Sequence, residues 1–532
     1  MATIGEVGAE MKDTISSGES RKIPLKLYFG VFFDGTGNNM IPSEIAKERR
    51  KTVKRLTGID DDWDLYINPD LKNGANEIKA KSVKDNNGFS AVHVGTGHSN
   101  VAILHSCYQG MSATERKKEE KNSCLHIYNI YIEGAGKEAV NDDSFVQDAE
   151  NVLGSGMGNG KTGVAALVSK AIRMVRIIVD GFSEYINNEN TSSEIHFDVF
   201  GFSRGATCAR LFSYVAGRDG KHKLGSEKKF SKFQAGVYFK EGYMHFLDKF
   251  KLTHDVTFLG IFDTVSSIGL TYDDNVADYG LFSPEEEWVK ETMHICAMDE
   301  FRDHFALTDI NISKEGNIEV FIPGCHSDVG GGYQIGSESF LLTYRRNLLS
   351  RNRMYTDFPN SSSKGVIEDI SPDCLQKLGW GIGDEMEENT LNGTIECNRE
   401  RILAGYSNIP LSLMKDRANK SKVNKSKCRF AEFPKGRFVV PKGLKKINEL
   451  CKSEVDKISC GRKWIFPGGS YSSDEYRNLR HRYLHFSATD ELLSKHNSIV
   501  HSPNIKDGTI CRIVYRGQKN ALSNPLYIYD YE

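Results

Sequence analysis

The hydrophobic and polar positions of this chain predict strands and helices that alternate through its first 335 residues. Apolar residues alternate with polar ones, or run without interruption, over segments that are typical of strands: 25–33, 125–132, 195–200, 256–262 and 318–322. Helices are expected over 164–179, where apolar residues recur about every 3.6 positions, and over 206–215. Strands that alternate with helices form a mostly parallel sheet flanked by helices, so we expect an α/β fold.

The length of the chain, 532 residues, exceeds what a single hydrophobic core usually holds. Beyond about residue 340 the sequence changes to segments rich in Lys and Arg, with short polar loops and scattered aromatic residues. The apolar run 510–515 is typical of a strand and is a candidate for rejoining the first part of the chain. We therefore expect a flexible segment over 1–22, an α/β domain over 23–338 with an insertion at about 218–250, and an accessory region over 339–532.

One turn carries the strongest chemical signal, Gly201-Phe202-Ser203-Arg204-Gly205-Ala206. The bare pattern Gly-x-Ser-x-Gly is a weak signal in a glycine-rich chain. Here, however, a predicted strand precedes it and a predicted helix follows it, which is the setting of a nucleophile elbow, where glycines make room around an exposed serine. The helix N-terminus favours the negative charge of a tetrahedral intermediate, so the N–H of Arg204 is a candidate oxyanion donor and Ser203 a candidate nucleophile.

A serine nucleophile needs a histidine that takes its proton and a carboxylate that orients this histidine. In the chain order expected for such an elbow, Asp263 follows the strand 256–262, and His326 follows the strand 318–322 in a glycine-dense loop. The alternative role for Asp263 is to cap the turn that comes after it. The main competitor of His326 is His294, whose neighbours predict a helix.

Further residues are candidates for supporting roles. The strand 25–33 ends in Asp34-Gly35-Thr36-Gly37-Asn38-Asn39, where the N–H groups of Gly35 and Thr36 are candidates for a second oxyanion donor. An ordinary Asp-Gly turn explains the same residues equally well. Asp34 is a reserve candidate for the acid or a polar anchor, and Asp328 is a further supporting candidate.

Four segments of the chain, taken in order, resemble the phospholipase effectors of bacterial type VI secretion that have an α/β-hydrolase catalytic domain: 32–39, 201–206, 262–265 and 324–332. The resemblance covers about 24–335, with a weaker echo at 480–487, and the basic stretch 218–233 departs from the family pattern. It implies an α/β-hydrolase-like sheet, a triad of Ser203, Asp263 and His326, and hydrolysis of membrane phospholipids in a rival cell. It also implies two protein partners, a type VI secretion spike protein and a cognate immunity protein.

Composition excludes several other classes of protein. The formal net charge of −2 gives no general electrostatic reason to bind nucleic acid. No apolar run of about eighteen residues is present, and 1–21 lacks the apolar core of a signal peptide. We therefore expect synthesis in the cytoplasm, export by a dedicated machine, and action in the periplasm or at the membranes of the target cell. The 11 cysteines have no regular spacing, so we expect neither a disulfide framework nor a zinc site, and the triad chemistry needs no metal or cofactor.

Two other motifs are weaker competitors. The glycine-rich stretch 154–162 is similar to a phosphate-binding loop, but serine stands at 155 where the motif needs glycine, and no predicted strand leads into it. Cys325 lies next to His326 but lacks a base of its own, which disfavours it as a nucleophile.

The accessory region has two features that suggest contact with lipid. The segment 415–429 carries seven Lys or Arg residues and one Asp, and is either a solvated loop or a site of attraction for anionic headgroups. The segment 444–458 is a candidate amphipathic helix, which lies either on the bilayer or on the protein core. The region is therefore a candidate lid or membrane-association region.

Together these observations predict a serine hydrolase that cleaves acyl esters of phospholipids, of the phospholipase A type. A peptidase or small-ester hydrolase with the same triad is one alternative, and a non-enzymatic scaffold is another. The scaffold is disfavoured because the candidate nucleophile, acid and base all fall at strand ends in the expected order.

Overall fold

The structure is a computed structural model, and it describes the central sheet and the residues that directly follow its main strands. The described residues are 24–36, 67–68, 98–135, 163–183, 186, 193–216, 253–266, 279–333, 336–343, 371–421, 423, 429–433, 435–458, 461–467, 474–489, 505–506, 509–510, 512–517 and 526–527. The segment 1–22, the insertion at about 218–250 and the glycine-rich stretch 154–162 lie outside them. The division of the chain at residue 338 stays a prediction.

Eight strands form the central sheet, in the order β12-β8-β6-β5-β4-β1-β3-β2. Neighbouring strands are parallel except at the edge, where β2 pairs antiparallel with β3. The expected mostly parallel sheet is confirmed, and the ends of the five predicted strands differ from the observed ones by no more than three residues. The bounds are β1 (Leu25–Phe33), β2 (Ile67–Asn68), β3 (Cys124–Ile132), β4 (Glu194–Phe202), β5 (Thr253–Phe262), β6 (Thr292–Ala297), β8 (Asn317–Ile322) and β12 (Arg462–Ile465).

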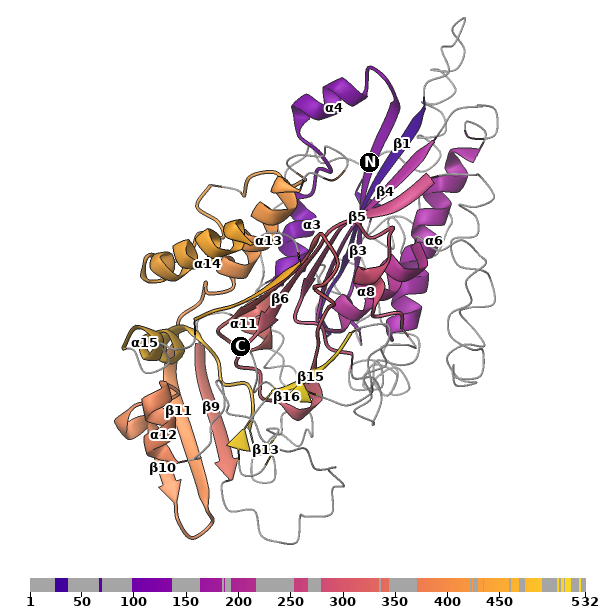
Figure 1. The fold of residues 1–532 in the computed structure, drawn as a ribbon. Coiled ribbons are helices and arrows are strands. Elements are labelled where there is room, and N and C mark those ends of the chain that lie inside the picture. Colours follow the sequence, from indigo (N-terminus) through magenta and orange to yellow (C-terminus); the bar gives the residue numbers. More distant parts are fainter. Residues whose placement is uncertain are drawn as a thin grey trace, which may run out of the picture.

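Helices cover both faces of this sheet (Figure 1). On one face lie α6 (Val164–Gly181) and α8 (Arg204–Ala216), and on the other lie α3 (Asn100–Cys107) and α13 (Asn408–Lys420). The apolar stripe predicted for 164–179 is the buried side of α6, and every residue of α8 is buried. Burying one stripe of each helix against the sheet gives the chain its core, because it removes apolar surface from water.

The parallel arrangement brings several chain segments to one edge of the sheet. The strands β1, β4, β5 and β8 end at residues 33, 202, 262 and 322, and all four run in the same direction. Loops that follow the carboxyl ends of parallel strands form the usual binding crevice of an α/β sheet. Ser203, Asp263 and His326 therefore all lie on this side of the molecule.

The prediction of a helix around His294 was wrong, because this residue lies in β6. All six residues of β6 are buried, between β5 on one side and β8 on the other. A short, mostly apolar run has no periodicity that separates a buried strand from a buried helix, and only the neighbouring strands decide between them.

The later part of the chain adds its own elements and also strands to the α/β part. β12 extends the central sheet beyond β8, and β15 (Ile513–Tyr515) pairs parallel with β7 (Leu307–Thr308). A second, three-stranded sheet has the order β10-β11-β9. The remaining elements are α4 (Ala113–Glu119), β9 (Gly336–Thr343), α12 (Pro372–Leu378), β10 (Met386–Asn389), β11 (Thr394–Ile402), α14 (Lys445–Lys457), α15 (Asp474–Tyr483), β13 (Ile505–Lys506), β14 (Thr509–Ile510) and β16 (Leu526–Tyr527).

The basic segment 415–429 is tied to the protein wherever the structure describes it. Its four described cations pair with acidic side chains of other segments: Lys415 with Glu432, Arg417 with Glu291, Lys420 with Asp456 and Arg429 with Asp198. Lys422, Lys425 and Lys427 lie outside the described residues. The four described charges therefore act first within the fold.

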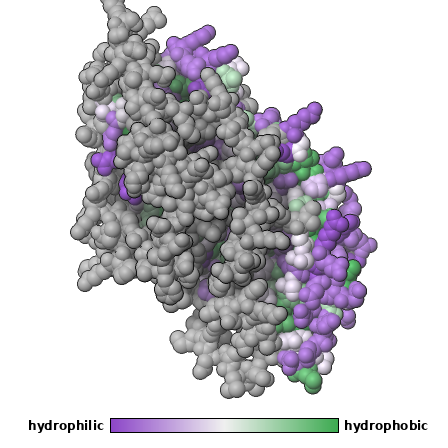
Figure 2. Space-filling model, turned by 180° about the vertical axis from the view of Figure 1, so that it is seen from behind, coloured by the Kyte–Doolittle hydropathy of each residue, from purple (hydrophilic) through white to green (hydrophobic). Residues whose placement is uncertain are grey.

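The amphipathic helix expected over 444–458 is α14, and it packs beside α13 (Figure 1). Its buried residues are Cys451 and Val455. Figure 2 shows that hydrophilic side chains dominate the described surface of this part of the molecule, with apolar ones scattered between them. Leu391, in the turn between β10 and β11, is the most exposed of these, at 95%. Among the described helices, none has the length and apolar character that crossing a membrane requires.

The ion pair between Arg429 and Asp198 gives a test of how the accessory region is joined to the core. Both side chains are buried, and Asp198 also accepts hydrogen bonds from Tyr108 and Thr257. Because Arg429→Gln leaves a carboxylate charge buried without its partner, we expect the free energy of unfolding to fall by about 3–5 kcal/mol. Urea denaturation followed by circular dichroism measures this loss.

The matched control is Arg116→Gln, which removes the exposed ion pair between Arg116 of α4 and Glu120, the residue after this helix. We expect this change to alter stability by less than about 1 kcal/mol. Equal stability of the two variants would mean that the buried pair contributes no more than a surface pair.

Candidate active site

Ser203 occupies a strained turn between β4 and α8. Its φ angle is +61°, in the left-handed region that side chains rarely adopt. The flanking glycines are required by close backbone contacts: a Cβ at Gly201 would lie 2.7 Å from Cα of Ala206, and one at Gly205 would lie 2.8 Å from the carbonyl carbon of Asp34. This is the geometry of a nucleophile elbow.

The elbow is joined to the loop that carries Asp263. The N–H of Ser203 donates to the carbonyl of Phe262 at 3.1 Å, and the N–H of Val265 donates to the carbonyl of Ser203 at 3.3 Å. Asp263 has a φ of +43°, so its backbone is also in the left-handed region. Two strained residues at the ends of neighbouring strands are thus held by hydrogen bonds between their own turns, as is common at functional sites.

Asp263 and His326 form a direct hydrogen bond. His326 is the first residue of α11 (His326–Gly330), and its Nδ1 lies 2.6 Å from Oδ2 of Asp263. Phe202 and Phe305 pack against the imidazole, with ring centroids 4.5 and 4.9 Å from it. The hydrogen bond assigns the proton to Nδ1 in the neutral ring and leaves Nε2 as the acceptor.

The surroundings shift the pKa values of both groups downward. Burial by itself raises the pKa of Asp263, but the charge of Arg512 and the hydrogen bond from His326 outweigh it and hold the pKa well below its usual range. Burial lowers the pKa of His326 below 6.5, and the hydrogen bond to Asp263 only partly opposes this. A neutral imidazole beside an ionised carboxylate is the state that a general base needs.

The hydroxyl of Ser203 is buried and has no hydrogen-bond partner among the described residues. Ser203, Asp263 and His326 have exposed fractions of 1%, 0% and 3%. In structures without substrate, the hydrogen bond between nucleophile and base is often long or absent, and it forms in the complex. The structure therefore brings Asp263 and His326 together and places Ser203 on the adjoining turn.

The candidate oxyanion donors have different surroundings. Arg204 begins α8, where the first amide groups have no carbonyl of their own helix to bind, so its N–H lies at the positive end of the helix. The N–H of Gly35, in contrast, donates to Oδ1 of Asp34 at 2.7 Å. The hydroxyl of Thr36 accepts from the guanidinium of Arg204 at 3.1 Å, so this side chain links the elbow to the loop after β1.

The hydrogen bonds of Asp34 are those of a polar anchor. Its carboxylate accepts hydrogen bonds from Ser99 at 2.6 Å and from Tyr131 at 2.5 Å, as well as from Gly35. Burial raises the pKa of Asp34, although these hydrogen bonds lower it in part. The side chain thereby ties β1 to β3 and to the start of α3.

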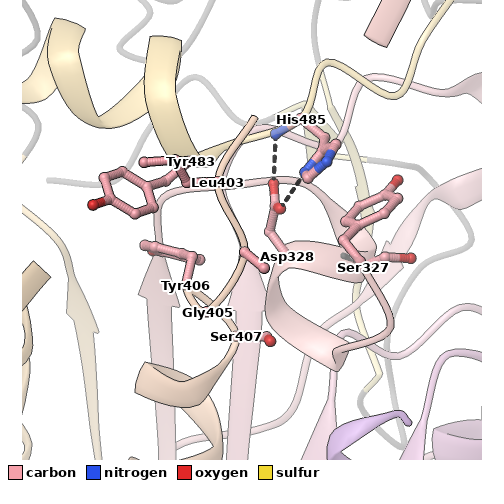
Figure 3. Close-up of a pocket in the computed structure, with 10 residues that line it drawn as sticks. Ser327, Asp328, Leu403, Gly405, Tyr406, Ser407, Tyr483 and His485 are labelled. Carbon is pink, nitrogen blue, oxygen red and sulfur yellow. Dashed lines mark hydrogen bonds and ion pairs between the residues drawn. The ribbon is translucent and has the colours of Figure 1, made fainter. Parts of the chain in front are cut away.

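Asp328 pairs with His485, a residue of the weaker echo at 480–487. Its Oδ1 lies 2.8 Å from Nδ1 of His485, and its Oδ2 accepts the N–H of His485 (Figure 3). Oδ2 also accepts the N–H of Cys325. Burial tends to lower the pKa of His485, but the charge of Asp328 raises it above its usual value. The pair lies at a small pocket beside α11, lined by Ser327, Asp328, Tyr333, Leu403, Ala404, Gly405, Tyr406, Ser407, Tyr483 and His485.

Three charged residues near His326 were missed by the sequence reasoning: Glu300, Arg302 and Arg512. Glu300 accepts the backbone N–H of His326 at 3.0 Å and pairs with the guanidinium of Arg302. Arg512 donates to Oδ2 of Asp263 at 2.8 Å. The signal for Arg512 was present, because a single charge inside the apolar run 510–515 indicates a buried ion pair.

His294 belongs to a buried cluster that adjoins the Asp263 loop. Its Nδ1 lies 2.9 Å from Glu319, and its Nε2 accepts the N–H of Thr264 at 3.2 Å, so both ring nitrogens are engaged. Ligand atoms of His294, Cys296 and Glu319 lie within 4.8 Å of one another, which is close enough for a metal ion. Glu319 is, however, already paired with Lys463 at 2.9 Å, and the group is wholly buried. We interpret the cluster as a satisfied core network.

Cys325 has the surroundings of an unreactive thiol. It is buried just before α11, and burial raises its pKa well above the usual value for a cysteine. The thiolate is the nucleophilic form, so this shift disfavours Cys325 as a nucleophile.

No curated protein matches this chain. A solved structure titled "Structure of the Tle1 effector bound to the VgrG spike from the Type 6 secretion system" is 18% identical with a TM-score of 0.46, and the match covers 90% of this chain and 88% of that one. An uncharacterized protein from Pseudomonas aeruginosa is 15% identical with a TM-score of 0.34, and the match covers 89% of this chain and 55% of that one.

A family model described as "T6SS, Phospholipase effector Tle1-like, catalytic domain" matches residues 84–351, which make up half of the chain. The matched part contains the elbow, the Asp263 loop and α11. The chain therefore belongs to the Tle1-like phospholipase effectors of type VI secretion.

Proposed function

We propose that this phospholipase cleaves acyl esters of membrane phospholipids with Ser203 as the nucleophile, His326 as the general base and acid, and Asp263 as the residue that orients it. The observation that carries the proposal is the 2.6 Å hydrogen bond between His326 Nδ1 and Asp263, beside a serine held in a strained elbow. The chemistry fits the family, whose members are phospholipase effectors.

The reaction follows from the tautomer of His326. Asp263 accepts a hydrogen bond from Nδ1–H of His326, so Nε2 is free to take the hydroxyl proton of Ser203 as the serine oxygen attacks the ester carbonyl. The imidazolium that forms is stabilised by the ionised Asp263, and it then returns the proton to the alcohol of the leaving lyso-lipid. Water repeats the same cycle on the acyl-enzyme and releases the fatty acid.

The negative charge of the tetrahedral intermediate needs donors that are already in place. We assign the first to the N–H of Arg204, because it lies at the N-terminus of α8 and directly follows Ser203. The second donor is proposed to come from the loop after β1, at Gly35 or Thr36. The N–H of Gly35 is bound to Asp34 before substrate arrives, so its use requires that this hydrogen bond be exchanged for one to the substrate.

The first test is release of fatty acid from phospholipid vesicles labelled separately at each acyl position. Ser203→Ala removes the nucleophile, so we expect release to fall by about a thousandfold or more. Comparing the two labels identifies the acyl bond that is cut. A serine-directed phosphonate should label the intact protein and fail to label the variant.

The matched control is Ser213→Ala, because Ser213 lies on α8, the helix that directly follows Ser203, and is also buried. This variant should release fatty acid at the rate of the intact protein. Hydrolysis of soluble esters without vesicle hydrolysis would favour the small-ester hydrolase, and a folded protein with no hydrolysis and no labelling would favour the scaffold.

The pH dependence of the reaction gives a second test. The base must be neutral, so activity is lost as the pH falls through the pKa of His326, which burial lowers below 6.5. Asp263, whose pKa is held far lower still, stays ionised throughout that range. The acid limb of kcat/KM on an uncharged soluble ester should therefore lie below pH 6.5, and an acid limb above about pH 7 would contradict the assignment.

We further propose that the effector is carried by a spike protein of the secretion machine, acts in the periplasm or at the membranes of the target cell, and is neutralised in the producing cell by an immunity protein. Family membership supports this proposal. We expect the full chain, with Ser203→Ala as a harmless form, to co-purify with a spike protein of its own strain. A producer deleted for that spike should fail to kill recipients, and unchanged killing would exclude this route.

A further inference from the structure

Arg512 reaches the centre of the proposed site from far along the chain. It comes 249 positions after Asp263, and its guanidinium is almost completely buried. Nη2 donates to Oδ2 of Asp263 at 2.8 Å, and Nη1 donates to the carbonyl of Ala297. The family model ends at residue 351, so this contact comes from outside the part of the chain that it matches.

Arg512 and Ala297 hold the carboxylate of Asp263 from two sides. The N–H of Ala297 donates to Oδ1 at 2.8 Å, and Arg512 donates to Oδ2, the same oxygen that accepts from His326. Since Arg512 also binds the carbonyl of Ala297, the three residues form a closed ring of hydrogen bonds. A carboxylate bound in this way cannot rotate without breaking at least one charged hydrogen bond.

Strand β15 fixes the position of Arg512. β15 begins at the next residue and pairs with β7, with Val514 opposite Leu307. β7 follows Phe305, the ring that packs against His326. One strand pairing therefore places both a ring against the base and a guanidinium against the acid.

The charges around Asp263 and His326 balance one another. Two anions, Asp263 and Glu300, and one cation, Arg302, act on His326. Arg512 adds a second cation, because it donates to Oδ2 of Asp263, the oxygen that also binds His326, and the thiol of Cys296 lies near Asp263 and Arg512. Removing the charge of Arg512 leaves two anions against one cation around the imidazole. The protonated ring would then be favoured, because an uncompensated negative charge stabilises a nearby cation.

We propose that Arg512 is a positioning residue of the active site: it holds the Asp263 carboxylate in the orientation that receives Nδ1–H of His326. This role rests on the proposed triad. Arg512 acts through Asp263 and does not itself contact the reacting atoms. The residue that leads into β15 is thereby a part of the support of the catalytic site.

The test compares the intact full-length protein with Arg512→Gln and Arg512→Lys on a soluble uncharged ester, between about pH 5 and pH 9. For Arg512→Gln we expect the acid limb of kcat/KM to rise by about one pH unit. We also expect kcat to fall about tenfold or more with little change in KM, because Asp263 loses a fixed donor. Arg512→Lys keeps the charge, but a single ammonium group cannot reach both Oδ2 of Asp263 and the carbonyl oxygen of Ala297. This variant should therefore have the acid limb of the intact protein and only part of its kcat.

Arg429→Gln is the matched control, because it breaks an equally buried arginine–aspartate pair outside the site. It should lower the melting temperature without moving the acid limb. An acid limb and kcat in Arg512→Gln that match those of the intact protein would overturn the proposal. If Arg512→Gln does not fold, Arg512→Lys decides. A kcat of Arg512→Lys equal to that of the intact protein overturns the role of Arg512. A lower kcat with an unchanged acid limb supports it.

This experiment separates two failures. If hydrolysis by the intact protein does not depend on Ser203, the proposed function fails and the role of Arg512 with it. If hydrolysis depends on Ser203 and both the acid limb and kcat are the same in all Arg512 variants, only the role of Arg512 fails.

Discussion

The buried carboxylate of Asp263 is the group on which the proposed site depends. Taking a carboxylate out of water costs several kcal/mol unless charged partners and hydrogen bonds replace the solvent. Here three donors replace it, from the end of β6, from α11 and from the residue before β15. Each donor comes from a different part of the chain. The ionised carboxylate is therefore stable only when these parts are assembled, and the same assembly orients the base.

A similar constraint applies to the loops around the base. Arg480 pairs with Asp299, His485 pairs with Asp328, and Ser487 donates to Glu300. Each of these acids lies close in sequence to β6 or to His326. Removing one partner of a buried charged pair leaves the other charge uncompensated, so these contacts require that the accessory region stay packed against the α/β part. The late segments of the chain thereby act as structural support for the loop that holds the base.

The strands and helices of the α/β part could be predicted because their signals are local. The alternation over 195–200, the glycines on both sides of Ser203 and the apolar stripe over 164–179 each identify an element from a few neighbouring residues. The element of His294 could not be predicted in this way, because a short buried strand and a short buried helix look alike in sequence. The surroundings of Gly35 could not either, because its hydrogen bond depends on where the side chain of Asp34 turns.

The sequence by itself determined the α/β class, the order of the strand-to-loop transitions, and the candidates Ser203, Asp263 and His326, because each depends on residues a few positions apart. Only the tertiary structure decided which charges meet. The contacts of Arg512 with Asp263, of His485 with Asp328 and of Arg429 with Asp198 join residues 249, 157 and 231 positions apart. Such pairs leave no periodic trace in a single sequence. They form because folding buries both charges at once, and a buried charge is stable only beside its partner.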